Sequence, residues 1–194
     1  MADITPAAQP PRILTFYTRI ALVAALTLYF ARAYVVRVFL AATGFIPFDL
    51  QFPLRPPTIA IQLGAYASPG VERLYSAFAL VDALFAVAVA AAVALSWLWL
   101  SARAPNRLFA FLKRGGILLL PMVAGVLDVI ENVGFHRLIE GLRGQSYADT
   151  IQWTATLHQV KAALIYIRDS LTLVFVGVTL ILLWRRRDRR LSSH

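Results

Sequence analysis

The stretch Ala83–Leu100 reads ALFAVAVAAAVALSWLWL and contains no charged side chain. A helix of about 20 apolar residues crosses the roughly 30 Å hydrocarbon core of a bilayer, so this stretch alone predicts a transmembrane helix. The composition agrees, because 59% of the 194 residues are hydrophobic and 15% are charged, against roughly 45–50% and 25% in ordinary soluble domains. We therefore expect an integral membrane protein.

Three further apolar runs are long enough to span a membrane if a few internal ionisable residues are accepted. We predict an all-α fold, an integral membrane four-helix bundle, in which residues 1–194 form a single transmembrane domain. Several prolines between the first two spans exclude a long helix there, so we expect an ordered outer loop, with a membrane-surface segment at Ile59–Tyr66 as the alternative. The predicted parts are spans at about 14–40, 71–100, 115–138 and 152–184, an outer loop at 41–70 and a basic cytoplasmic tail at 185–194.

The distribution of basic residues predicts the orientation of the chain. They concentrate before the first span, between the second and third spans and after the fourth, and the positive-inside rule then places both termini in the cytoplasm. The abundance of Ala and Arg is typical of GC-rich bacterial genomes, so we expect a multi-pass protein of a bacterial inner membrane. The run Ile20–Phe30 followed by Ala31-Arg32-Ala33 also resembles a signal peptide with its cleavage site. Apolar sequence continues past that site, which favours an uncleaved span.

Ionisable residues recur inside the predicted spans at a similar depth. With a rise of about 1.5 Å per residue, most of them lie roughly 20–28 Å above the cytoplasmic flank, in the outer half of the bilayer. An unpaired charge at the bilayer centre costs about 2.5–3.5 kcal/mol, so these groups are expected to pair or to be hydrated. By contrast, we expect the acids of the outer segments, Asp49 among them, to balance the basic residues outside the membrane. The predicted polar cluster, structural or ligand-binding, comprises Asp82, Asp128, Glu131, Asn132, His136, Lys161, Arg168, Asp169 and Arg32.

Helical spacing brings several of these residues to common faces. Asp128, Glu131 and Asn132 are spaced i, i+3 and i+4, which puts them on one face of the third span, with His136 one turn further. On the second span Asp82 lies beside a row of small residues that predicts close helix packing. This row comprises Ala79, Ala83, Ala86, Ala90 and Ala94.

The third span carries a short motif, D-x-x-E-N, formed by Asp128, Glu131 and Asn132 after Leu120-Pro121. With Arg73-Leu74-Tyr75 before Asp82, and Lys161 on the fourth span, the segment from about Gln51 to Tyr166 resembles small bacterial four-span membrane proteins that carry this motif. The resemblance implies a four-span fold and a shared polar site, and it implies no reaction.

The cluster is compatible with several functions. An accessory or assembly subunit of a membrane complex needs only that the polar groups hold the bundle together or contact a partner subunit or a second copy of the chain. A membrane-embedded enzyme, or a binder of lipids or small ligands, would use the buried acids with His or Lys for acid–base or metal chemistry. An oligomeric transporter of protons or small solutes is a further alternative. The candidate metal ligands are Asp82, Asp128, Glu131, His136 and His158.

The lack of several known motifs restricts the chemistry that this sequence supports. The chain has no cysteine, no G-x-S-x-G, no H-E-x-x-H and no glycine-rich phosphate loop, and no motif supports haem or chlorophyll ligation, so the sequence names neither a catalytic residue nor a cofactor. The bilayer itself is an expected partner, whereas nucleic acid is not, because no folded cytoplasmic domain accompanies the basic tail. Candidate lipid-headgroup contacts in that tail are Arg185, Arg186, Arg187, Arg189 and Arg190.

Overall fold

The computed structural model describes residues 10–66, 68–103, 109–110, 116–141 and 148–191. This part of the chain is helical and contains no strand. Four helices are long and apolar enough to cross a membrane, and the prediction of an all-α four-helix bundle is confirmed. They are α1 (Arg12–Thr43), α3 (Pro69–Arg103), α5 (Leu120–Glu140) and α6 (Ala148–Leu191), and the shorter elements are η1 (Phe48–Leu50), α2 (Pro56–Tyr66) and η2 (Ile117–Leu119).

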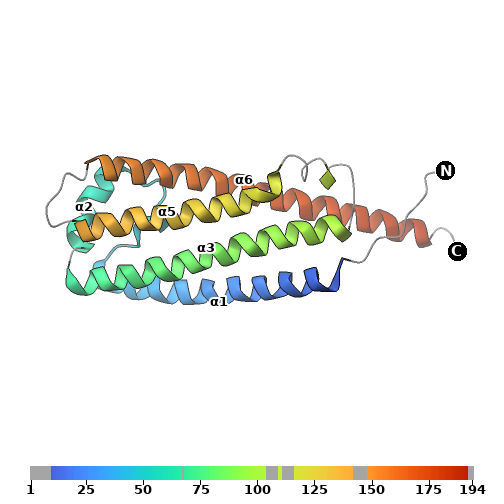
Figure 1. Ribbon diagram of the computed structural model, residues 1–194, viewed down its shortest axis with the longest axis horizontal. Helices are drawn as coiled ribbons and strands as arrows, with labels where there is room; N and C mark the ends of the chain where they lie inside the picture. Colours follow the sequence, from blue (N-terminus) through green and yellow to red (C-terminus); the bar gives the residue numbers. More distant parts are fainter. Residues whose placement is uncertain (1–9, 67, 104–108, 111–115, 142–147, 192–194) are drawn as a thin grey trace.

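The long helices form an open array rather than a closed ring. Helix α1 packs along α3, α3 packs on α5, and α5 packs on α6, whereas α1 and α6 make little direct contact. Figure 1 shows α3 and α5 between the two outer helices, with α2 at one end of the bundle. The first turns of α1 and the last turns of α6 lie at the opposite end. Helices α1 and α6 therefore form the two edges of the array.

The connection between α1 and α3 contains more helix than the sequence predicts. Helix α1 ends at Gly44, whose φ of 75° is a left-handed conformation that favours glycine, and its N–H donates to the Leu40 carbonyl over 2.8 Å. The chain then forms η1 and α2, and Ile59 and Tyr66 of α2 are fully buried. Helix α2 packs on α3, α5 and α6, so it is part of the bundle.

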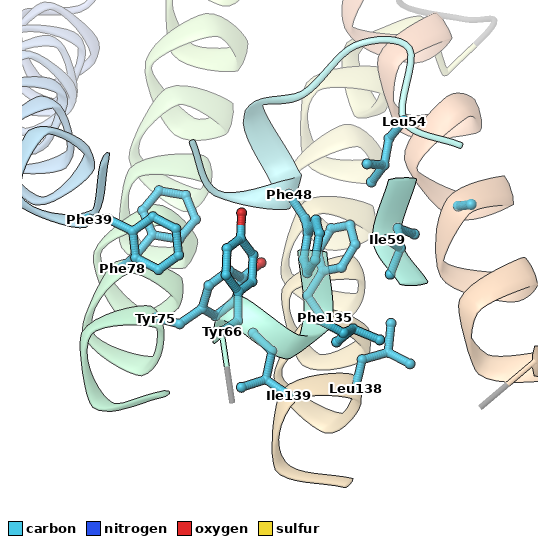
Figure 2. Close-up of a cluster of buried hydrophobic side chains, with 12 residues drawn as sticks. Phe39, Phe48, Leu54, Ile59, Tyr66, Tyr75, Phe78, Phe135, Leu138 and Ile139 are labelled. Carbon is cyan, nitrogen blue, oxygen red and sulfur yellow. The ribbon is translucent and has the colours of Figure 1, made fainter. Parts of the chain in front are cut away.

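An aromatic cluster fills the α2 end of the bundle. Phe48 stacks on Phe135 with ring centroids 5.4 Å apart, and the Tyr66 ring lies 4.5 Å from Phe48 and 4.9 Å from Phe39. Tyr75 of α3 meets the rings of Phe39, Phe48 and Tyr66 at 5.7, 6.2 and 5.8 Å (Figure 2). Aromatic pairs of this geometry contribute about 0.5–1.5 kcal/mol beyond the area that they bury. The cluster thereby fixes η1 and α2 against three of the long helices.

A second apolar cluster lies further along the bundle, away from α2. Trp97 of α3, Phe175 of α6 and Phe109 are buried together, and the Trp97 and Phe175 rings are 4.8 Å apart. The Trp97 indole N–H donates to the Thr172 hydroxyl over 2.9 Å. Helices α3 and α6 are therefore joined at this level.

Small residues set the distance between α5 and its neighbours. A Cβ on Gly125 would lie 2.9 Å from the Ala90 Cβ and 3.4 Å from the Ala86 carbonyl oxygen of α3. On the side of α5 that faces α6, a Cβ on Gly134 would lie 2.9 Å from the Thr154 hydroxyl of α6. The close packing predicted from the alanine row is confirmed at Ala86 and Ala90.

This packing predicts that Gly125→Val destabilises the bundle. The larger side chain has no room against α3, and overpacking of this kind costs about 1–3 kcal/mol. A lower midpoint of thermal unfolding of the detergent-solubilised protein is the expected result. Gly177→Val on α6 is the matched control, because a Cβ there meets nothing within 4 Å. Equal midpoints for the two variants would contradict the close approach.

Candidate functional site

Lys161 of α6 lies at the centre of a buried group of charged side chains. Its ammonium contacts three carboxylates: Asp128 at 2.8 Å and Glu131 at 2.5 Å, both from α5, and Asp49 from η1. The Lys161 side chain is 4% exposed. One cation therefore joins α5, α6 and the connection between α1 and α3.

Arg32 of α1 is the second cation of the group. Its guanidinium lies 3.2 Å from an Asp49 carboxylate oxygen and also contacts Asp82 of α3. The Asn132 amide donates to the other Asp82 oxygen over 2.8 Å. The guanidinium carbon lies 5.1 Å from the centre of the Phe85 ring, within the range of a cation–π interaction. Arg32 thus connects α1 to the same cluster through Asp49 and Asp82.

His158 completes the cluster from α6. Its Nδ1 lies 2.5 Å from a Glu131 carboxylate oxygen. His158 is 3% exposed, and its Nε2 has no hydrogen-bond partner among the described residues. A carboxylate that accepts from one ring nitrogen orients the imidazole and leaves the other nitrogen available to a ligand.

The cluster contains more negative than positive groups. Four buried carboxylates, those of Asp49, Asp82, Asp128 and Glu131, face two permanent cations, Arg32 and Lys161. A charged His158 reduces the formal excess to one negative charge, and a neutral His158 leaves two. A buried net charge is unfavourable in a medium of low dielectric constant, so protons or a further cation are needed to balance it.

Asp49 was expected to balance the basic residues of the outer segments and is instead a buried member of the cluster, 6% exposed. Burial raises the pKa of its carboxyl. The Lys161 ammonium and the Arg32 guanidinium together lower the pKa by more than burial raises it, to about 2. Because this value lies below the ordinary one, ionised Asp49 stabilises the fold above about pH 4, and that contribution is lost as the pH falls toward about 2. The expectation failed because η1 folds back between the helices, which brings Asp49 to Arg32 and Lys161.

A partly open cavity of about 360 Å³ adjoins the cluster. All four long helices and the segment around η1 contribute to its wall. The charged and histidine side chains in its wall are Arg32, Asp49, Asp82, Asp128, His158, Lys161 and Arg168, and the other lining residues are Leu50, Phe52, Phe85, Ala86, Val89, Ala124, Gly125, Ala162, Ile165 and Tyr166.

The structure brings six of the nine predicted cluster residues together. Three others lie apart: His136 contacts Glu140 at 3.0 Å on its own helix and lies 3.5 Å from the Ser76 hydroxyl, and Arg168 pairs with the exposed Asp169 at 2.8 Å. Arg168 reaches the cavity wall, whereas His136 and Asp169 do not. The residues that meet are Arg32, Asp82, Asp128, Glu131, Asn132 and Lys161.

The basic tail continues helix α6. The helix extends to Leu191, and Arg185 is exposed on it. The side chains of Arg186, Arg187, Arg189 and Arg190 lie outside the described residues. Their contact with lipid headgroups stays a prediction.

Two groups of ligand atoms are close enough to share a metal ion. One comprises Asp49, Glu131 and His158, and the other Asp49, Asp82 and Asp128, with the atoms of each group within 4.8 Å of one another. His136, a candidate ligand in the sequence, belongs to neither. Both groups include Asp49, whose two oxygens already contact Lys161 and Arg32. The two basic side chains therefore compete with a metal ion for these carboxylates.

A comparison with family models, curated proteins and solved structures finds no match for this chain.

The position of Lys161 predicts a large loss of stability in Lys161→Met. Removal of one partner of a buried ion pair leaves uncompensated charge and costs about 3–5 kcal/mol. Thermal unfolding in detergent should show a strongly lowered midpoint. The matched control is Arg185→Met, because Arg185 is an exposed cation near the end of the same helix. Similar midpoints for the two variants would contradict the central position of Lys161.

Proposed function

We propose that this protein binds an amphipathic molecule that enters from the lipid bilayer. The cavity beside the charged cluster carries this proposal, because its wall combines charged side chains with apolar ones. A headgroup at Asp128, Lys161 and His158 would place a hydrocarbon chain against Phe85, Val89 or Ile165. Ligand sites typically combine a mostly apolar wall with a few polar groups, in cavities of about 300–1,000 Å³.

The arrangement of the helices supports entry from the side. Helices α1 and α6 contribute Arg32 and Ile165 to the cavity wall but make little contact with each other. The gap between two transmembrane helices faces the acyl chains of the bilayer. A lipid-like molecule can therefore reach the cluster without passing through either end of the bundle.

The cellular setting and the wider role belong to the same proposal. The distribution of basic residues supports a bacterial inner membrane with both termini in the cytoplasm. The resemblance to four-span proteins with the D-x-x-E-N motif fits a site built around Asp128, Glu131 and Asn132. An accessory role in a larger membrane complex stays a prediction, and stoichiometric partner subunits in the purified material would support it.

The test is to fill the cavity and measure what remains bound. We expect Ala162→Phe to lower the amount of copurified lipid per protein about tenfold, because the ring occupies the cavity and overpacking costs about 1–3 kcal/mol. The lipids are quantified by mass spectrometry after extraction in a mild detergent. Ala163→Phe is the matched control, because Ala163 is the next residue of α6, is exposed and does not line the cavity.

A second pair of variants tests the same cavity from α3. Val89 lines the cavity, and Val87 is 55% exposed and does not. Val89→Phe should reproduce the loss of bound lipid, and Val87→Phe should not. Equal lipid content in all four variants would show that the copurified lipid does not occupy the cavity, and the proposal would be wrong.

A further inference from the structure

We propose that the ligand of the cavity carries a positive charge, an ammonium group bound at Asp128 beside Asp82. This inference rests on the proposed function and specifies the chemical class of the headgroup. It follows from three observations: an unpartnered carboxylate oxygen at the cavity, the excess of acids in the cluster, and an unpartnered imidazole nitrogen on the same wall.

Asp128 offers the contact. Its Oδ1 is bound to Lys161 at 2.8 Å, whereas its Oδ2 has no polar partner among the described residues. The residue is 9% exposed and lines the cavity. A carboxylate oxygen that lines a cavity and has no protein partner is open to a ligand, and a charged donor forms the stronger hydrogen bond with it.

The surrounding acids strengthen the preference for a cation. Carboxylate oxygens of Asp49, Asp82 and Asp128 lie within 4.8 Å of one another, so a cation at Asp128 is attracted by all three. Arg32 and Lys161 offset only part of the charge of the four acids in the cluster. An ammonium group therefore lowers the uncompensated charge, whereas a carboxylate or phosphate at the same position raises it.

His158 supplies a second polar contact. When a neutral imidazole donates its Nδ1–H to Glu131, its Nε2 is left as a hydrogen-bond acceptor. That nitrogen is buried, has no partner among the described residues and belongs to a residue of the cavity wall. Asp128 and His158 line the same cavity, and an ammonium carries N–H donors for acceptors of either kind.

A metal ion is a less suitable occupant of the same space. Lys161 contacts Asp49, Asp128 and Glu131 already, and a metal would have to displace it from at least one of them. An ammonium needs only the free Asp128 oxygen. The apolar residues of the cavity wall also provide contacts for a hydrocarbon chain, which a metal ion does not use.

The test compares three amphiphiles that share one hydrocarbon chain: oleylamine, oleyl alcohol and oleate. Binding to the full-length protein is measured by native mass spectrometry from a non-ionic detergent, at a mildly alkaline pH where the amine is protonated and the acid ionised. We expect the amine to bind about tenfold tighter than the alcohol, as a charge-assisted hydrogen bond implies, and oleate to bind weakest. Binding of the alcohol as tight as that of the amine, or a preference for oleate, would overturn the inference.

Two aspartate variants locate the charge. Asp128→Asn keeps the shape of the side chain and should remove most of the preference for the amine. Asp149→Asn removes an exposed carboxylate in the first turn of α6 that does not line the cavity, and the variant should keep the preference for the amine. If the preference survives in a folded Asp128→Asn protein, the assignment to Asp128 is wrong.

The same experiment separates this inference from the proposed function. Oleyl alcohol reports occupation of the cavity without charge, and Ala162→Phe should abolish its binding. If the alcohol binds in a way that Ala162→Phe blocks but the amine is not preferred, the cavity binds amphiphiles and protons balance the acids. If Ala162→Phe changes the binding of none of the three probes, the proposed function itself fails.

Discussion

The bundle depends on one ammonium group that is shared by three carboxylates. Lys161 provides three N–H donors on a compact head, and it contacts Asp49, Asp128 and Glu131. In a membrane none of these groups has bulk water as an alternative partner. The connection between α1 and α3 therefore has to fold inward, and α5 and α6 have to face each other at this level, before the charges are matched.

Sequence analysis predicts the helices better than it predicts the partners of their charges. Apolar run length identifies the four long helices, and the spacing of Asp128 and Glu131 correctly places them on one face of α5. His136 lies on the same helix but eight residues beyond Asp128, about 12 Å along the axis. Its neighbours there are Glu140 and Ser76. Asp49 lies outside the long helices, so helical spacing does not predict its partners. Its position depends on how η1 packs against the bundle. A lone acid within the apolar run Phe45–Leu50 is the signal that would have identified it.

The small residues of α3 and α5 have two effects that are usually opposed. Gly125 allows α5 to approach Ala86 and Ala90 of α3 closely, which increases packing. The same Gly125 and Ala86, with Ala124, also line the cavity, where their lack of bulk leaves space beside Asp128. Close contact on one side of these residues and open volume on the other follow from the same short side chains. Helix packing and ligand space are thus encoded at shared positions.

The two apolar clusters bear on how charge can move through the protein. The aromatic cluster around Phe48 and Tyr66 separates the charged group from the α2 end, and the cluster around Trp97 and Phe175 lies toward the other end. In the described part of the chain the charged group therefore lies between two packed apolar clusters, and a partly open cavity adjoins it. Charge in this interior is held between two layers of packed hydrocarbon.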